Sequence, residues 1–485
     1  MKRMIRFRLN RALYEEELPD ESLALDFIRN VAGLKGTKEG CREGDCGACL
    51  VLLGGRGPEG AVEWKGVTSC TLGLGDLDGR QLITIEGLAA DGLTPVMEAM
   101  LDEGASQCGF CSPGFILALT GALLTGERLD ASSIMTAVEG NLCRCTGYGS
   151  IRRAAGRLAR SFADLPEGLA ARLPILVERR VLPAALAELM LDLPEPAGLG
   201  QAAFAAIHPE DPSVVHIGGG TDYYVRNPDP EPDMAPRFSD QAPEARAIRR
   251  VEEGGSAWIE IGAAGTADDF FDSPLVRQLA AGIERYAVEI ASPPIRARAT
   301  LVGNIVNASP IADMTAMLIA LGARVMIEGA TGGQIRFVEL DRFYLGYKKL
   351  DLRAGERIGA LRVPAETLRF SFEKAAKRAR LDIATLNTAL AVRMAADGTV
   401  AAARYAAGGV APVPLRLDPA EKLLVGRRPS ADLARELGRL AYASGSPIGD
   451  VRGSSEYRKR LMERLAWAHC IRLWPELKLE EELLA

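Results

Sequence analysis

The sequence predicts a multidomain α+β protein, and three observations support that class. The chain has 485 residues, which is enough for about three domains of roughly 150 residues each. Its first 86 residues alternate like short strands around one helix, and the stretch that follows has the apolar spacing of helices. After about residue 201 the pattern mixes strands with helices again.

The first region, residues 1–86, is predicted to be a small α+β domain. Residues 3–9 (RMIRFRL) alternate like an edge strand, and residues 21–30 (ESLALDFIRN) have the apolar spacing of a helix. Further short strands are expected at 50–53, 61–65 and 82–85.

Residues 87–162 are predicted to form a compact bundle of four short helices. Each helix follows a residue type that is typical of an N-cap, and two of these residues are followed by proline at the first helical position. The expected N-caps are Thr94, Ser112, Asp130 and Ser150.

The rest of the chain divides into a linker and two further domains. Prolines recur through residues 163–200, which we interpret as a linker and the entry to the next domain. Residues 201–364 are predicted to form an α/β domain, with a strand at 258–262 (WIEIG). Residues 365–485 are predicted to form a smaller α+β domain that ends in a helix.

Composition excludes some classes of partner. The formal net charge is -6 and the sequence has no basic stripe, so we expect no nucleic-acid partner. No stretch resembles the ~20 apolar residues that span a membrane. The N-terminus MKRMIRFRLN lacks the apolar region of a signal peptide. We therefore expect a cytoplasmic protein with no membrane contact.

The cysteines are distributed unevenly along the chain. Eight of the nine lie between Cys41 and Cys145, and only Cys470 lies beyond them. Disulfide frameworks belong to short secreted chains, whereas clustered cysteines in a long cytosolic chain more often bind metal or react. We therefore expect the eight to bind metal and Cys470 to be a small core residue.

The first cysteine group has the spacing of a plant-type [2Fe–2S] site. Three cysteines stand in GCREGDCGACL as C-x4-C-x2-C, and a fourth follows after twenty residues. The glycines of this loop let it wrap tightly around a cluster and bring N–H groups towards the sulfurs. Zinc is the alternative, although zinc knuckles usually pair two C-x2-C units. The predicted ligands are Cys41, Cys46, Cys49 and Cys70.

The second cysteine group has the spacing C-x2-C-x31-C-x1-C, in SQCGFCSPG and NLCRCTGY. Each pair is expected at or just before a helix N-terminus, where the positive end of the helix dipole faces an anionic cluster. On spacing alone zinc is a serious rival, but the C-x-C pair is unusual for structural zinc. The predicted ligands are Cys108, Cys111, Cys143 and Cys145.

Both motifs together resemble the molybdenum hydroxylases, the xanthine dehydrogenase and aldehyde oxidase family. KEGCREGDCGAC, SQCGFCSPG and GNLCRCTGY are similar to that family's two cluster signatures, in the same order. The resemblance implies a ferredoxin-like β-grasp fold for the first domain and the family's four-helix [2Fe–2S] domain for the second. It also implies that Gln107, just before the second site, approaches a molybdopterin cofactor.

The resemblance continues into the third domain. The glycines of HIGGGTDYY at 216–224 would let backbone N–H groups approach phosphate, although alone they indicate no more than a turn. The segment resembles the family's FAD pyrophosphate loop. The implied FAD-binding residues are Ile217, Gly218, Gly219, Gly220, Thr221, Asp222 and Tyr223. A packed structural role is expected for His216.

ATLVGNIVNASPIAD at 299–313 resembles the family's second FAD signature, with two departures. Val302 stands where the family commonly has glycine, and Ile290 aligns with a position that carries phenylalanine in some members. Lys374 matches a lysine near the flavin, and a solvated surface lysine is the alternative. The implied FAD contacts of the signature are Thr300, Gly303, Asn304, Ser309 and Asp313. The C-terminal region resembles the small C-terminal domain of the same flavoproteins.

The resemblance implies an electron relay. No molybdopterin domain fits into the 485 residues, so a separate molybdopterin-binding large subunit is the expected partner, as in bacterial xanthine dehydrogenase. Electrons would pass through the two [2Fe–2S] clusters to FAD and on to NAD+, and a dimer of heterodimers is implied. No catalytic residue is expected on this chain. Other substrates (an aldehyde, nicotinate or another N-heterocycle) and a non-catalytic scaffold are the alternatives.

Overall fold

The computed structural model describes residues 2–126, 128–197, 214–230, 235–238, 243–329 and 334–484. The chain divides into two compact units. The first comprises residues 1–244 with 292–299, and the second comprises residues 245–291 with 300–485. None of the described helices is both long enough and apolar enough to cross a membrane.

The first unit begins with a five-stranded mixed sheet in the order β2-β1-β5-β3-β4. β1 and β5 pair in parallel, and the other neighbours are antiparallel. A single turn of α-helix, α1 (Ala24–Asp26), continues as a π-helix over Phe27–Val31 and packs on the sheet. This order confirms the predicted β-grasp fold. The strands are β1 (Lys2–Leu9), β2 (Ala12–Pro19), β3 (Leu50–Arg56), β4 (Val62–Thr68) and β5 (Gln81–Ile83).

The structure corrects the place of the first strand. β1 was expected at the edge of the sheet, but β2 lies outside it and forms the edge. β2 (ALYEEELP) is mostly exposed and lacks an apolar alternation, so its sequence does not indicate a strand. Its backbone pairs with β1 along its whole length and Tyr14 stacks on Phe7, while Arg6 of β1 donates to both carboxylate oxygens of Glu15.

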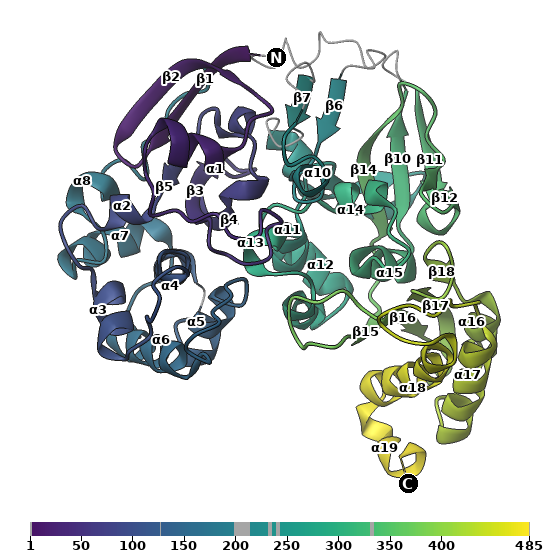
Figure 1. Cartoon of the computed structure of the whole chain (residues 1–485). Helices are drawn as coiled ribbons and strands as arrows, with labels where there is room; N and C mark the ends of the chain where they lie inside the picture. Colours follow the sequence, from purple (N-terminus) through teal and green to yellow (C-terminus); the bar gives the residue numbers. More distant parts are fainter. Residues whose placement is uncertain are drawn as a thin grey trace. The chain divides into compact units, whose positions relative to one another are not determined.

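A helical group follows in the first unit (Figure 1). The four predicted helices are present, and α4 is buried along almost its whole length. Thr94 and Asp130 are N-caps as expected, but Cys111 and Tyr148 occupy the cap positions that were predicted for Ser112 and Ser150. The helices are α2 (Ile85–Leu88), α3 (Pro95–Asp102), α4 (Ser112–Thr125), α5 (Ala131–Ala137) and α6 (Gly149–Ser161).

The segment interpreted as a linker contains two helices, α7 (Leu169–Glu178) and α8 (Ala184–Ala187). Leu176 and Leu186 are fully buried in the same apolar core as α4 and α6. The prolines concealed these helices in the sequence, because Pro174 lies inside α7 and Pro183 directly precedes α8. The domain boundaries derived from the sequence stay a prediction.

The first unit also contains a short parallel pair, β6 (Val214–Ile217) and β7 (Ala235–Phe238). The glycine-rich turn follows β6 and leads into the four-residue helix α10 (Tyr223–Arg226). α13 (Pro293–Arg296) belongs to the segment that returns to this unit, and a short 3-10 helix spans Pro243–Arg246.

The second unit is built on two sheets. A five-stranded antiparallel sheet has the order β11-β10-β14-β9-β8, and a four-stranded antiparallel sheet has the order β15-β16-β17-β18. The first sheet comprises β8 (Ile248–Glu253), β9 (Ser256–Gly262), β10 (Arg324–Glu328), β11 (Ile335–Glu339) and β14 (Arg357–Pro364). The second comprises β15 (Arg369–Ala375), β16 (Leu386–Met394), β17 (Val400–Gly408) and β18 (Leu415–Arg416). A separate hairpin pairs β12 (Tyr344–Gly346) with β13 (Lys349–Leu350).

Helices cover both sheets of the second unit. α15 is buried on nearly all its residues and packs against β16 and β17, and α17 and α18 pack together over the second sheet. The helices that precede the second sheet in the chain are α11 (Ala267–Asp272), α12 (Pro274–Leu279), α14 (Leu301–Asn307) and α15 (Asp313–Ala320). Those that follow the second sheet are α16 (Asp418–Leu424), α17 (Ala431–Ala443), α18 (Ser455–Leu473) and α19 (Glu480–Leu483).

Candidate cofactor sites

The first four predicted cysteines lie at one end of the five-stranded sheet. Cys41, Cys46 and Cys49 occupy the loop before β3, and Cys70 lies in a short 3-10 helix directly after β4. Cys49 and Cys70 are buried, at 2% and 1% exposed. The Sγ of Cys46 accepts from the N–H of Cys41 at 3.4 Å, and the Sγ of Cys41 accepts from the N–H of Glu43 at 3.3 Å.

These thiols are in mutual contact. Hydrogen bonds from the Cys46 and Cys70 thiols lower the pKa of Cys41, and N–H groups of the loop act in the same direction. A hydrogen bond from Cys70 likewise lowers the pKa of Cys49. The same contacts raise the pKa of Cys46 and of Cys70, so they favour the thiolate, the form that binds iron, only at Cys41 and Cys49.

The second four cysteines come together as two pairs from two loops. Cys108 and Cys145 have their Sγ atoms 3.7 Å apart, and Cys111 contacts Cys143. Burial raises the pKa of Cys111 to about 12, and the Cys143 thiol adds to the shift. Burial also opposes ionisation of Cys143, but hydrogen bonds from Thr146, whose Oγ1 lies 3.1 Å from its Sγ, make the net pKa shift downward.

The two cysteine sites differ in exposure. Cys108 and Cys145 are exposed at the surface of the first unit, and Gln107 beside them is exposed too. Phe110 and Leu142, from the same two loops, are 45% and 39% exposed. Among the described residues, no three or more His, Cys, Asp or Glu side chains are grouped as a single-ion site requires. The thiols of the second site lie in two pairs.

The loops of the two sites are in direct contact. The N–H of Leu142 donates to the carbonyl of Cys46 at 3.0 Å, and the side-chain amide of Asn141 donates to the carbonyl of Gly47 at 3.2 Å. A Cβ on Gly114, in the first turn of α4, would lie 2.2 Å from that same carbonyl oxygen. Glycine is required there because the helix and the loop approach backbone to backbone. A single hydrogen bond thus joins Cys46 to the residue next to Cys143.

The glycine-rich loop is shaped by close packing within the first unit. A Cβ on Gly219 would lie 1.6 Å from the carbonyl oxygen of Arg298, and Gly220 has a φ of +73° with Thr71 nearby. Gly219, Gly220 and Ile217 are buried, whereas Gly218, Thr221 and Tyr223 are half-exposed and Asp222 is exposed. Small residues in a partly open turn suit the approach of phosphate oxygens. The expectation for His216 was wrong, because its side chain is exposed rather than packed.

The second FAD signature lies in the second unit, at the start of α14 and α15. Thr300 caps α14 and accepts from the N–H of Gly303 at 3.0 Å. The amide oxygen of Asn304 accepts from Thr315 at 3.2 Å, and Ser309 Oγ accepts from the N–H of Ile311 at 3.4 Å. The two departures lie on the core side of this segment, since Ile290 is buried and Val302 packs against the same core.

Lys374 and Asp313 form a buried pair in the second unit. The Nζ of Lys374 lies 2.7 Å from Asp313 Oδ2 and 2.7 Å from the carbonyl of Glu289. The side chain of Lys374 is 6% exposed, which excludes a solvated surface lysine. Asn387 donates to the other oxygen of Asp313 at 2.5 Å. Burial raises the pKa of Asp313, and the ammonium of Lys374 opposes that shift.

Several residues that organise these sites were missed in the sequence. Arg298, Asn141 and Asn387 each hold a loop carbonyl or a site carboxylate. Arg42 lies inside the first cysteine motif, yet nothing in its spacing indicates the partners of its side chain. These contacts join segments far apart in the sequence, so no local pattern signals them.

Four protein families match the chain in succession. The 2Fe-2S iron-sulfur cluster binding domain matches residues 7–72, and the [2Fe-2S] binding domain matches residues 84–156. The FAD binding domain in molybdopterin dehydrogenase matches residues 201–366. The CO dehydrogenase flavoprotein C-terminal domain matches residues 371–470. The chain therefore carries two [2Fe–2S] domains and an FAD-binding domain.

Relatives of known activity agree with these matches. The chain is 26% identical to xanthine dehydrogenase of Emericella nidulans, over 94% of this chain but only 38% of that protein's length. It is 41% identical to the nicotinate dehydrogenase small FeS subunit of Eubacterium barkeri, over 27% of this chain and 78% of that subunit. A carbon monoxide dehydrogenase structure from Hydrogenophaga pseudoflava matches 58% of this chain and 96% of its own, at 28% identity and a TM-score of 0.51. On these grounds the chain belongs to the molybdenum hydroxylase family of oxidoreductases.

Proposed function

We propose that this chain is the electron-transfer subunit of a xanthine dehydrogenase. In this proposal a molybdopterin-binding large subunit oxidises the substrate and passes electrons to this chain. The electrons enter at the second [2Fe–2S] cluster, held by Cys108, Cys111, Cys143 and Cys145. They continue through the first cluster, held by Cys41, Cys46, Cys49 and Cys70, to FAD and then to NAD+.

The contact between the two cysteine loops carries this proposal. One hydrogen bond, from the N–H of Leu142 to the carbonyl of Cys46, links the two ligand sets. The exposed pair Cys108 and Cys145 gives the second site a surface for an outside donor, whereas Cys49 and Cys70 lie inside the unit. In this proposal the exposed pair is the entrance of the relay, and the linked first site receives the electrons next. Gln107 beside the exposed pair is the residue we expect nearest the partner's molybdopterin.

The residues at the flavin segments fit an FAD. FAD accepts single electrons and releases them as a pair, which links cluster chemistry to hydride chemistry. The half-open glycine turn from Ile217 to Tyr223 would face the pyrophosphate. The polar residues Thr300, Asn304 and Ser309 would hydrogen-bond the cofactor. Lys374, fixed by Asp313, would hold its positive charge near the flavin.

The substrate and the assembly rest on the relatives. Xanthine is proposed because a relative named xanthine dehydrogenase aligns with 94% of this chain. Nicotinate or another N-heterocycle is the second candidate, because the subunit of nicotinate dehydrogenase has the higher identity, 41%, over the cluster region. A dimer of heterodimers is proposed for the complex with the large subunit.

Metal and flavin analysis of the purified chain tests the cofactors. We expect about four irons and one FAD per chain. Stoichiometric zinc in place of iron would overturn the cluster assignment.

Purification from the source cell tests the partner and should recover a molybdenum-containing subunit. Assays of that complex on xanthine, nicotinate and aldehydes, with NAD+ and with oxygen, identify the substrate and the acceptor. Turnover of xanthine by this chain alone would contradict the division of labour.

A further inference from the structure

A buried arginine, Arg298, hydrogen-bonds the backbone of the glycine-rich loop. The Nε of Arg298 donates to the carbonyl of Gly219 at 3.1 Å, and its guanidinium forms an ion pair with Asp76. The side chains of Arg298 and Asp76 are 4% and 0% exposed. Asp76 lies in a short 3-10 helix of the ferredoxin domain, between Cys70 and β5, and also pairs with Arg80 at 3.3 Å. The carbonyl of Gly219 is therefore bound by the guanidinium of Arg298, which Asp76 of the ferredoxin domain fixes in place.

The same loop also touches the segment that carries Cys70. A Cβ on Gly220 would lie 3.1 Å from the carbonyl oxygen of Thr71. Tyr224, which follows the loop, is fully buried and packs with Leu23 and Ile217. The loop thus lies against the ferredoxin domain on one side and against the backbone of Arg298 on the other. It has no room to change position without moving one of them.

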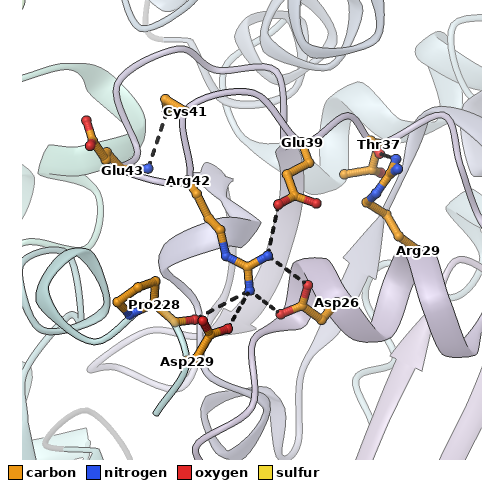
Figure 2. Close-up of polar contacts among 9 residues, drawn as sticks. All are labelled: Asp26, Arg29, Thr37, Glu39, Cys41, Arg42, Glu43, Pro228 and Asp229. Atoms are coloured by element: carbon orange, nitrogen blue, oxygen red, sulfur yellow. Dashed lines mark hydrogen bonds and ion pairs between the residues drawn. The ribbon is translucent and has the colours of Figure 1, made fainter.

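A second arginine, Arg42, contacts the chain at Pro228, a few residues after the glycine-rich loop (Figure 2). Arg42 stands between Cys41 and Glu43 with a φ of 60°, and its guanidinium binds Asp26 at 2.7 Å. The same guanidinium donates to the carbonyl of Pro228 at 3.4 Å and lies 3.7 Å from Asp229. It also pairs with Glu39 of its own loop at 2.9 Å.

The two contacts differ in expected strength. The Arg298 pair is buried, so water does not screen it and removing either member is costly. The side chain of Arg42 is 25% exposed and that of Asp229 is 94% exposed, so water screens this pair. We therefore expect Arg298 to dominate and Arg42 to contribute a smaller part.

We propose that Arg298 and Arg42 are positioning residues that make FAD retention depend on the ferredoxin domain. Each arginine is anchored by a carboxylate of that domain and holds one end of the segment from Gly219 to Pro228. The proposal rests on the proposed role of the glycine-rich loop in FAD binding. Because linkage is reciprocal, any factor that the bound first cluster adds to FAD affinity is also the factor that bound FAD adds to the affinity for that cluster.

FAD titration of flavin-depleted protein with both clusters present tests the Arg298 contact. We expect Arg298→Gln and Asp76→Asn each to weaken FAD binding by about tenfold or more, because each breaks the buried ion pair that fixes the guanidinium at the Gly219 carbonyl. Arg298→Lys, which keeps the charge opposite Asp76, should recover part of the affinity.

The matched control is Arg172→Gln. Arg172 is also buried and donates to three backbone carbonyls, but those carbonyls lie at Leu123, Gly126 and Pro166. It should lower stability and leave the FAD affinity unchanged.

Arg42→Gln tests the second contact, and Arg29→Gln is its control. Arg29 donates to the carbonyl of Thr37 at 2.7 Å in the same part of the domain, but no hydrogen bond joins it to the loop segment among the described residues (Figure 2). We expect a loss of about two- to threefold in FAD affinity for Arg42→Gln and none for Arg29→Gln. Iron content checks that each variant keeps both clusters.

Iron release measures the reciprocal effect. Bound FAD should slow the transfer of iron from the first cluster to a chelator in the wild-type protein, and it should not do so in Arg298→Gln. If the wild-type protein binds no FAD, the proposed function of the loop fails. If it binds FAD and both Arg298→Lys and Asp76→Asn bind it as tightly as wild type with intact clusters, the positioning role is overturned.

Discussion

The two cysteine sites share one chemistry and differ in where the fold places them. Cys49 and Cys70 of the first site lie inside the β-grasp domain, whereas Cys108 and Cys145 of the second site are open to solvent. Cys41 and Cys46 are half-buried and Cys143 is buried, so the sites differ in their most exposed members. In the proposed relay, the exposed pair gives the second site the entrance position.

The largest difference is expected when one ligand is removed from each site. Cys49→Ser should lose the first cluster and lower the stability of the β-grasp domain, because Cys49 and Cys70 are buried and join the loop before β3 to the turn after β4. Cys108→Ser should lose only the second cluster, so that iron falls from about four to about two per chain while the first domain stays folded. Iron analysis and thermal unfolding measure both effects. Cys470→Ala is the control, since Cys470 is a core residue as predicted and its removal should leave the iron content unchanged. Equal stability of the two ligand variants would contradict the comparison.

The contact between the sites is tested at Gly114. In Gly114→Ala the new Cβ would meet the carbonyl of Gly47 at 2.2 Å, so the two loops must separate. We expect a loss of about 1–3 kcal/mol in the free energy of unfolding and slower electron transfer between the clusters in stopped-flow measurements. The control is Gly156→Ala in α6, where a Cβ meets nothing closer than 3.6 Å. That change should stabilise by about 0.5–1 kcal/mol, with the same transfer rate as wild type.

Acid should destabilise the second unit before the unit that carries the cysteines. His469 in α18 is fully buried, and its Nε2 hydrogen-bonds Thr388 at 2.8 Å. Burial lowers its pKa from 6.5 to about 3, with Arg472 adding to the shift. Between these values the unfolded state binds a proton that the folded state does not, so stability falls as the pH falls. The expected slope is about 1.4 kcal/mol per pH unit.

Denaturant unfolding at several pH values measures this slope. His469→Gln, which keeps a polar side chain beside Thr388 but does not titrate, should reduce it. A slope that is unchanged in the variant would assign the acid sensitivity to other groups. Cluster absorbance should persist while the second unit unfolds.

The smallest effect is expected at the rim of the second site. Phe110 is 45% exposed, so Phe110→Ser should change the free energy of unfolding by no more than about 0.5 kcal/mol. It should nevertheless weaken the binding of the molybdopterin subunit, because an apolar side chain beside the exposed cluster suits a partner surface. Leu345→Ser, at a 66% exposed residue of the second unit, is the control and should leave that binding unchanged. Equal binding by both variants would remove the rim from the proposed interface.

Local chemistry made much of this protein readable from the sequence. The spacings C-x4-C-x2-C and C-x2-C-x31-C-x1-C identify both cysteine groups, since ligands of one cluster must come from short loops with fixed reach. Thr94 and Asp130 cap helices as predicted, because capping depends on the residue and its next three neighbours. Strands and helices with clear apolar periods were predicted for the same reason.

Only the tertiary structure decided the contacts between distant segments. β2 was missed because it has no apolar alternation, and its backbone pairing with β1 is accompanied by one aromatic contact, Tyr14 on Phe7. α7 was missed because a proline inside it contradicts helix propensity, and burial of Leu176 outweighs that cost. Gly219 was interpreted as a phosphate-loop residue, and the structure adds that the Arg298 backbone leaves no space for a side chain there. The spacing of the cysteines indicates which of them share a site, whereas packing between loops decides which cysteines of each site are buried and how the two sites are joined.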